Sequence, residues 1–437
     1  MRIERYQSYK DSEIEWLEEV PEQWSLSRIK SLTKTKSGTT PQSGLSQYYD
    51  NGTHFWIRTT DLNNGKLHSS EFKVTDLARE HYNLTSIPVR SVLLAMYGGM
   101  GTIGKNAILQ EEVTINQSVC AILPKDKKFV SEYLWYYIQY FRPHWEIFAD
   151  SARKDPNINQ EAIKRLWVTL PSLPEQKTIA HYLDTKTAQI DRKIDLLTQK
   201  ATLYGNLKQS LINKTVTRGL GKSVPIKDSD YEWDQRIPEN WQGERVKNIF
   251  KLVTDLAPSD NEFELLSLYT SIGVKPRKDM EQRGNKSVTT DGYWMVKKGD
   301  IIVNKLLAWM GAIGLSEYDG VTSPAYDILR KSSKGTDQRF YTYLFRTEKA
   351  QAIFKKQSRG IMDVRLRLYF DKFGAISVPF PPPEEQKAIA DYLDTKTAQI
   401  DQIIQTINTQ IGKLKELRKT LINDVVTGKI KVVENEY

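Results

Sequence analysis

The sequence predicts a mixed α+β (α/β) protein in which two globular domains, related by a pseudo-twofold axis, are joined by two long antiparallel, coiled-coil-like helices. Three observations predict this arrangement. One segment occurs twice almost unchanged, the residues after each copy have the apolar spacing of a coiled coil, and the stretches before the copies are rich in short β-like runs. At 437 residues, the chain is also longer than one hydrophobic core usually organises.

The repeated segment is the most informative feature of the chain. Residues 175–191 read EQKTIAHYLDTKTAQID and residues 385–401 read EQKAIADYLDTKTAQID, so that 15 of 17 positions are identical. The similarity continues downstream, where 208–217 (KQSLINKTVT) aligns with 418–427 (RKTLINDVVT). A fainter repeat relates 10–24 to 227–241, and the stretches between share only MGTIG (100–104) and MGAIG (310–314). The chain therefore contains one pattern twice: a similar first segment, a variable middle, and a near-identical last segment that we call the exit.

Each near-identical exit is predicted to be a long helix. Prolines precede both copies and suit a first helical turn, and Glu175 and Glu385 favour the positive end of the helix dipole. Gly219 and Gly428 are expected to end the two helices. Apolar residues recur at the a/d spacing of a coiled coil: Ile190, Ile194, Leu197, Ala201 and Tyr204 in the first copy, and Ile400, Ile404, Ile407, Ile411 and Leu414 in the second. We expect the two seams to pack against each other, with packing of each helix on its own domain as the alternative.

These features set the expected boundaries: a first globular domain at 1–173, a long helix at 174–217, a second globular domain at 218–383, and a second long helix with a tail at 384–437. Short β-like runs place strands at 54–60, 91–97, 299–309 and 375–380. Helical patterns occur at 131–142 and 338–355.

Composition limits the classes of function. With 63 Lys and Arg against 54 Asp and Glu, the net charge is +9 and the pI is about 9.1. Such an excess suits a polyanionic partner, although a solvated basic surface is the alternative. The single cysteine, Cys120, points to a reducing cytoplasm. The five histidines have no paired metal-ligand spacing, and we expect neither a signal peptide nor a membrane span.

Several segments together resemble a known family. They are the doubled EQxxIAxYLDTKTAQID helix motif, then SGTTPQ (37–42), FWIRTTDL (55–62) and GTIGK (101–105) in the first middle, and GDIIVNKLLAWMGAIG (299–314) with VTSPAYDIL (321–329) in the second. The chain resembles, over nearly its whole length, the specificity subunit of a type I restriction–modification enzyme. The second middle lacks the GxTP and WIxTxDL stretches of the first, which implies that the two domains read different half-sites.

The resemblance implies a DNA sequence-specificity subunit that is not catalytic by itself. Two target-recognition domains would each read one half of a bipartite target in double-stranded DNA. The helices would set the spacer and dock two methyltransferase (modification) subunits that methylate adenine, and restriction/translocase subunits would join for cleavage. The chain would bind no cofactor or metal, since S-adenosylmethionine, ATP and magnesium would belong to the partner subunits.

Three other classes of protein are alternatives to this hypothesis. No (D/N)PP(F/Y/W) turn and no phosphate-binding loop of the GxxxxGK(S/T) type occur in the sequence, which argues against a methyltransferase or a motor. Asp61 followed by Glu71 and Lys73 imitates the D…ExK pattern of a magnesium nuclease, but no proline precedes Asp61 and ExK arises readily by chance. A scaffold with no DNA role would leave the basic charge and the two variable middles unexplained.

Candidate DNA-contacting residues come from the family-like blocks and from one basic stretch. Short hydroxyls, arginine and side-chain amides suit phosphate and base-edge contacts, whereas a plain turn at SGTTP is the alternative reading. In the first domain the candidates are Lys36, Thr39, Thr40, Arg58, Thr60, Asp61, Tyr97, Lys105, Asn116 and Gln117. In the second domain they are Asn304, Lys305, Ser323, Tyr326, Lys355, Lys356, Arg359, Arg365 and Arg367. For the basic stretch, 355–372, a solvated helix face is the alternative. We expect Trp309 to lie in the core rather than to stack on a base.

Candidate subunit-docking residues come from the repeated helix motif. A coiled-coil seam requires only its apolar positions, yet the polar residues between them also recur unchanged. Recombination between the repeats is one explanation; the other is that both faces meet copies of the same methyltransferase. The docking candidates are Asp184, Lys186, Thr187 and Asp191 in the first copy, and Asp394, Lys396, Thr397 and Asp401 in the second.

Overall fold

The computed structural model describes residues 1–98, 101–124, 129–148, 157–221, 224–229, 233, 236–270, 272–280, 290–360 and 366–433. Contacts divide the chain into two units, each of which holds one globular part and a portion of both long helices. Unit 1 comprises Met1–Leu197 with Thr409–Tyr437, and unit 2 comprises Thr198–Asn408. The boundary between the units therefore falls near the middle of each long helix, not at the predicted helix starts.

The globular part of unit 1 is organised by a five-stranded sheet with the order β5-β12-β9-β10-β7. Its strands are β5 (Thr33–Ser37), β7 (Gly65–Leu67), β9 (Val92–Ala95), β10 (Asn106–Leu109) and β12 (Val119–Pro124). β10 and β7 are parallel, whereas the other neighbours are antiparallel. A second sheet, β11-β6-β8, comprises β6 (His54–Ile57), β8 (Lys73–Val74) and β11 (Thr114–Ile115). The first sheet contributes all of its central strands to the core because Val92–Ala95 and Asn106–Leu109 are buried throughout.

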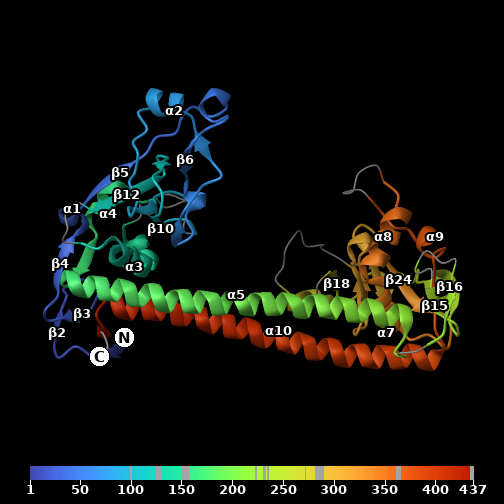
Figure 1. The fold of residues 1–437 in the computed structure, drawn as a ribbon. Coiled ribbons are helices and arrows are strands. Elements are labelled where there is room, and N and C mark those ends of the chain that lie inside the picture. The colour runs from blue at the N-terminus through green and yellow to red at the C-terminus, as the bar shows by residue number, and fades with distance from the viewer. Residues whose placement is uncertain are drawn as a thin grey trace. The chain divides into compact units, whose positions relative to one another are not determined.

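Helices and small strand pairs complete the globular part of unit 1 (Figure 1). The helices are α1 (Ile29–Leu32), α2 (Asp76–His81), α3 (Ser131–Phe141) and α4 (Gln160–Arg165), with 3-10 turns η1 (Ser46–Tyr48), η2 (Thr59–Asp61) and η3 (Arg142–Phe148). The pairs are β1 (Arg2–Glu4) with β26 (Lys431–Val433), β2 (Tyr9–Asp11) with β3 (Glu19–Pro21), and β4 (Ser25–Arg28) with β13 (Trp167–Leu170). The predicted helix at 131–142 is confirmed as α3.

Unit 2 contains a four-stranded antiparallel sheet, β17-β24-β21-β22. Its strands are β17 (Phe250–Leu252), β21 (Ile301–Asn304), β22 (Ile313–Leu315) and β24 (Tyr326–Lys331). The remaining pairs are β14 (Ile226–Asp228) with β15 (Arg236–Pro238), β16 (Gln242–Arg245) with β25 (Ser377–Phe380), β18 (Leu266–Tyr269) with β19 (Gly273–Pro276), and β20 (Trp294–Val296) with β23 (Gly320–Thr322). The order of its sheet matches β5-β12-β9-β10 of unit 1. Two middles without comparable sequence therefore share one strand arrangement.

The helical pattern at 338–355 forms two helices rather than one, which corrects that prediction. α7 (Gln338–Phe345) ends at Arg346, and α8 (Glu348–Gln357) begins after Thr347, whose hydroxyl accepts the Ala350 N–H at 3.2 Å. This side-chain cap satisfies an amide that a new helix start would leave without a partner. The predicted strand at 299–309 is likewise short, because β21 ends at Asn304 and a turn, η5 (Ala308–Met310), follows. α6 (Val246–Ile249), α9 (Phe370–Phe373) and η4 (Arg277–Asp279) complete the unit.

The two long helices are α5 (Leu173–Arg218) and α10 (Pro383–Val426). Their predicted ends are confirmed, since Gly219 and Gly428 follow in the left-handed conformation with φ of 72° and 81°. In unit 1, Arg418 Nε of α10 lies 3.0 Å from Asp191 Oδ1 of α5; in unit 2, Lys208 Nζ of α5 lies 2.7 Å from Asp401 Oδ2 of α10. The five predicted seam residues of α5 are all half-buried and the residues between them are exposed, and Ile400 and Ile407 of α10 are buried. In each unit the helices thus bury the predicted seams.

Candidate nucleic-acid interface

The topology of unit 1 brings most of its candidate residues to one end of the main sheet. β5 and β9 finish where β10 and β12 begin, because Ser37 pairs with Cys120, Ala95 with Val119, and Leu94 with Asn106. β6 and β11 finish together at the same place, with Ile57 opposite Ile115. We call this place loop end 1. It comprises residues 38–40, 58–61, 96–98, 104–105 and 116–118.

Contacts at loop end 1 join candidates that are nearly eighty residues apart in the sequence. The Gly38 N–H donates to the Asn116 carbonyl at 3.3 Å, and the Thr40 hydroxyl donates to the Gln117 side-chain carbonyl. The Trp56 indole donates to the Thr39 carbonyl at 3.2 Å. A side chain at Gly38 would meet the Ile115 carbonyl oxygen at 1.7 Å, so only glycine allows this approach. The SGTTP segment is therefore a packed part of loop end 1, not an isolated turn.

The second group of candidates at loop end 1 has mixed roles. Asp61 Oδ2 accepts the Arg58 N–H at 2.8 Å, which closes η2, and the Arg58 guanidinium lies 3.2 Å from the centre of the Phe72 ring. Thr60 is exposed. The closure of η2 therefore explains Asp61 without a metal site. Lys73, the lysine of the nuclease-like pattern, lies over the Phe55 ring at 5.1 Å. In the part of the chain that the structure describes, no three His, Cys, Asp or Glu side chains form a group that could hold a metal ion.

Three further candidates of unit 1 lie on or beside the sheet. Tyr97 follows β9 with 38% of its surface exposed, and half-buried Lys105 precedes β10. Lys36 is exposed within β5, opposite Ala121. Tyr97 and Lys105 thus belong to loop end 1. Lys36 lies within β5, one residue before the strand ends at Ser37.

The equivalent end of the unit 2 sheet, loop end 2, comprises residues 253–255, 304–312 and 323–326. Asn304 pairs with Tyr326 there, and Ser323 is half-buried beside them. Lys305 Nζ donates to the Pro324 carbonyl at 2.7 Å and lies 3.4 Å from Asp327 Oδ1. Burial raises the pKa of Asp327 above its usual value, and the opposing effect of Lys305 is smaller. Asn304 is 9% exposed and its Oδ1 accepts the Leu306 N–H. Asn304 and Lys305 therefore hold the loops of this end in place.

The basic stretch of unit 2 lies beside loop end 2. Lys355 and Lys356 are exposed on α8, and Lys355 Nζ lies 5.1 Å from the half-buried Trp309 ring. Arg359 pairs with Asp371 at 2.7 Å, and the backbones of Arg359 and Arg367 exchange two hydrogen bonds of 2.9 Å. The Leu368 N–H donates to the Lys305 carbonyl at 2.9 Å, which fixes this stretch against loop end 2. Arg365 lies outside the described residues.

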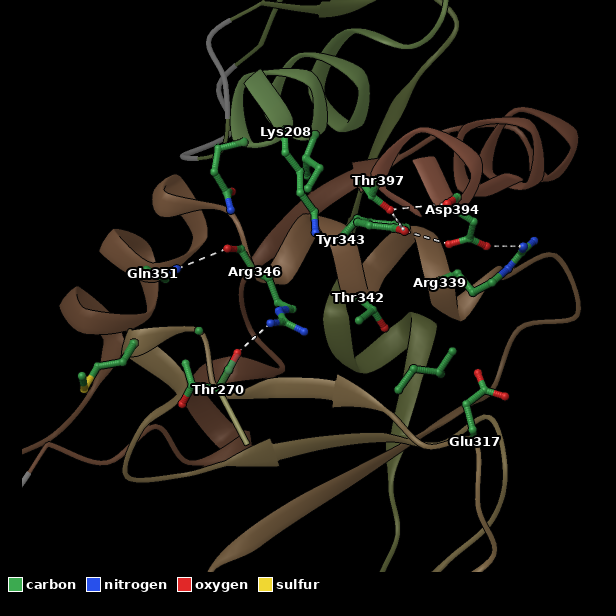
Figure 2. A pocket seen from close by; sticks show the side chains of 15 residues that line it. Lys208, Thr270, Glu317, Arg339, Thr342, Tyr343, Arg346, Gln351, Asp394 and Thr397 are labelled. Carbon is green, nitrogen blue, oxygen red and sulfur yellow. Dashed lines mark hydrogen bonds and ion pairs between the residues drawn. The ribbon is translucent and has the colours of Figure 1, made fainter. Parts of the chain in front are cut away.

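A tyrosine joins each globular part to its long helix, and the sequence analysis missed this residue. In unit 2 the Tyr343 hydroxyl of α7 donates to Asp394 at 2.8 Å and lies 3.2 Å from the Thr397 hydroxyl, as Figure 2 shows. In unit 1 the Tyr136 hydroxyl of α3 donates to Asp184 at 2.6 Å and lies 3.2 Å from the Thr187 hydroxyl. Burial raises the pKa of both phenols, in the case of Tyr343 to about 12. The signal available in the sequence was a tyrosine within an otherwise dissimilar helix.

These joints change the interpretation of the docking candidates. Thr187 and Thr397 are 4% and 7% exposed, so their hydroxyls serve the joints rather than an outer face. Asp184 also binds Lys66, Asp394 also binds Arg339, and Asp191 and Asp401 bind Arg418 and Lys208. A coiled-coil seam accounts only for the apolar residues of the repeated motif, whereas these contacts inside the chain use its polar residues. Lys186 lies over the Tyr182 ring and Lys396 donates to Gln399, so these two contacts lie within the lysines' own helices.

The geometry defines a class of protein: two domains of one sheet arrangement, each with polar loops at one sheet end, carried on a pair of long helices. The family described as "Type I restriction modification DNA specificity domain" matches residues 21–201 and again 238–413. The chain therefore belongs to the type I restriction–modification specificity subunits, with two target-recognition domains.

Known relatives support the assignment of the chain to this family. A Methanocaldococcus jannaschii chain, named provisionally as the MjaX type I restriction enzyme specificity subunit, is 23% identical over 99% of both chains. The StySPI specificity subunit of Salmonella potsdam is 22% identical over 94% of this chain and 90% of its own. Among solved structures, a chain from a study of type I R-M complex assembly superposes with a TM-score of 0.68, at 14% identity over 93% of this chain and 98% of its own. The HsdS subunit of Thermoanaerobacter tengcongensis superposes with a TM-score of 0.53, at 13% identity over 96% and 99%.

Proposed function

We propose that this chain places two methyltransferase subunits on a bipartite double-stranded DNA target, with loop ends 1 and 2 each contacting one half-site. The observation that carries the proposal is the convergence of separate polar segments at the same end of two equivalent sheets. The chain would act in the cytoplasm without catalysing the reaction. S-adenosylmethionine, ATP and magnesium would be bound by the methyltransferase and the restriction/translocase subunits. No helix in the described part of the chain is long and apolar enough to cross a membrane.

Exchange of one recognition domain tests whether the two half-sites are read separately. Residues 32–170 run from the end of α1 to the end of β13, and β13 pairs with β4, so both junctions lie in adjacent, ordered segments. Replacing this stretch by that of another specificity subunit should change one half-site and leave the other intact. Methylation mapping of the chimera is the measurement, and a change in both half-sites would contradict separate reading.

The basic stretch beside loop end 2 is expected to contact phosphates. Replacing Lys355, Lys356 and Arg359 with Ala should weaken DNA binding for all sequences alike. It should also flatten the log–log salt dependence by about 0.9 for each phosphate contact that is lost. The Arg359–Asp371 pair offers little competition because both side chains are more than half exposed. Titrations at several salt concentrations measure the slope, with Lys200→Ala on α5 as the matched control. A wild-type slope in the triple variant would exclude this stretch from the interface.

The lysines of the repeated motif remain candidates for methyltransferase docking. Charge reversal at Lys186 alone should loosen one methyltransferase subunit, and reversal at Lys186 and Lys396 should loosen two. Native mass spectrometry of the reconstituted complex would show two, one and no bound subunits in turn. Retention of both subunits at wild-type affinity in the double variant would move the docking surface elsewhere on the helices.

A further inference from the structure

In each unit a crevice lies where the globular part meets the long helices, and the repeats relate these two crevices. The unit 2 crevice has a volume of about 760 Å³ and is lined from α5 by Lys208, Gln209 and Ile212 (Figure 2). The unit 1 crevice, of about 230 Å³, is lined from α10 by Arg418, Lys419 and Ile422. These three residues occupy the same places in 418–427 that the first three occupy in 208–217.

The same parts build both crevices. In each, the cation from one long helix is held by an aspartate of the other: Lys208 by Asp401 and Arg418 by Asp191. The short helix of the globular part supplies the residue three positions after the joint tyrosine, which is Arg346 in unit 2 and Gln139 in unit 1. Arg418 also donates to Gln139 at 3.3 Å. This common plan is independent of the sequence differences between the recognition domains.

Both crevices present cations that an acidic ligand would stabilise. Among the described residues that line the unit 1 crevice, four are cations (Arg142, Lys415, Arg418 and Lys419) and none is a carboxylate. In the unit 2 crevice the Arg346 guanidinium donates to the Thr270 carbonyl at 2.6 Å. Burial lowers the pKa of both Arg142 and Arg346. A half-buried guanidinium bonded to a neutral carbonyl gains charge-assisted hydrogen bonds when a carboxylate approaches.

The lining favours a protein ligand over DNA. The unit 2 crevice includes Met310, which is 48% exposed, together with Ile212 and Leu315. Exposed methionine beside arginine and apolar residues is typical of protein interfaces. Two crevices of one plan fit two copies of one protein.

We propose that the crevices are sockets for an acidic, partly apolar segment of two copies of one partner, the methyltransferase subunit. This inference rests on the proposed function and moves the main docking contact from the repeated polar face to the junctions beside it. Each socket joins a recognition domain to the helices, so a bound methyltransferase is fixed with respect to the domain that reads its half-site.

The test uses the full chain reconstituted with its methyltransferase subunit and counts bound subunits by native mass spectrometry. For the unit 1 crevice the variant is Lys415→Glu with Lys419→Glu. For the unit 2 crevice it is Gln209→Glu, which lies on α5 and outside loop end 2, with Arg346→Gln, which introduces the residue found at the equivalent place in unit 1. Lys413→Glu on α10 and Lys200→Glu on α5 are the controls, since both are exposed on the same helices outside the linings. Thermal unfolding verifies that each variant is folded.

We expect each crevice variant to retain one methyltransferase, the combined variant to retain none, and both controls to retain two. The dissociation constant at an altered crevice should rise by at least about tenfold. Wild-type occupancy in a folded combined variant overturns the inference, and so does a loss of DNA affinity with methyltransferase binding unchanged, which would assign the crevices to DNA. If the wild-type chain itself binds no methyltransferase, the proposed function fails as well, so the two failures are distinguishable.

Discussion

Lengthening both long helices by the same amount is expected to lengthen the non-specific spacer between the two half-sites. Four residues inserted after Thr198 in α5, with four after Asn408 in α10, add about 6 Å of helix, or about two base-pair steps of 3.4 Å. Seven residues at both places add about 10.5 Å, or about three steps, and keep the a/d register of the seam. Loss of methylation at the original sites and its appearance at longer sites would be a complete change of specificity.

Methylation mapping measures the spacer directly, and the two insertion lengths give a graded result. Insertion of the same four residues beside Asn51, in the exposed turn after η1, is the control. It should leave the spacer unchanged, because that turn is not part of either helix. A folded, active variant with the wild-type spacer after insertion in both helices would show that the helices do not set the separation.

The buried glutamine at the start of each long helix is expected to be the most sensitive single position of its unit. Gln176 donates to the Pro171 carbonyl at 2.9 Å and accepts the Val130 N–H at 2.9 Å; Gln386 donates to the Pro381 carbonyl at 2.8 Å and accepts the Asp337 N–H at 3.1 Å. Both side chains are 0% exposed. Substitution by leucine leaves the carbonyl of a buried proline and the N–H of a half-buried residue unsatisfied at about 1–3 kcal/mol each, so we expect a loss of about 3 kcal/mol.

Thermal unfolding of Gln176→Leu and Gln386→Leu should show the transition of the affected unit lowered by about 6–12 °C. Hydrogen exchange would assign the loss to unit 1 for Gln176→Leu and to unit 2 for Gln386→Leu. Gln189→Leu is the matched control, since Gln189 is exposed on α5 and should change the transition little. Equal stability of all three variants would mean that these glutamines do not anchor α3 and α7 to the long helices.

The candidate interface was only partly accessible from the sequence. Thr40 and Gln117 were both chosen, yet their contact depends on the antiparallel pairing of β5 with β12, which no local pattern reveals. Strand pairing joins residues that are distant in sequence, so a residue list cannot show which candidates share one end of a sheet. Nor does a residue list show that the Asn304 side chain bonds to Leu306 in its own loop, or that Lys305 bonds to Pro324 in a neighbouring one.

The sequence by itself determined the two long helices, including their seams and the glycines that end them. A helix is specified by a short period and by residues at its ends, and here the repetition doubled the signal. The tertiary structure decided what the repeated polar residues do. Asp184 and Thr187 were expected to face a partner, but Tyr136 reaches them from a helix about fifty residues away, and Tyr343 reaches Asp394 and Thr397 in the same way. An identical motif can be retained for a contact inside the chain, and only the packing of a non-local tyrosine against it distinguishes that case from a binding surface.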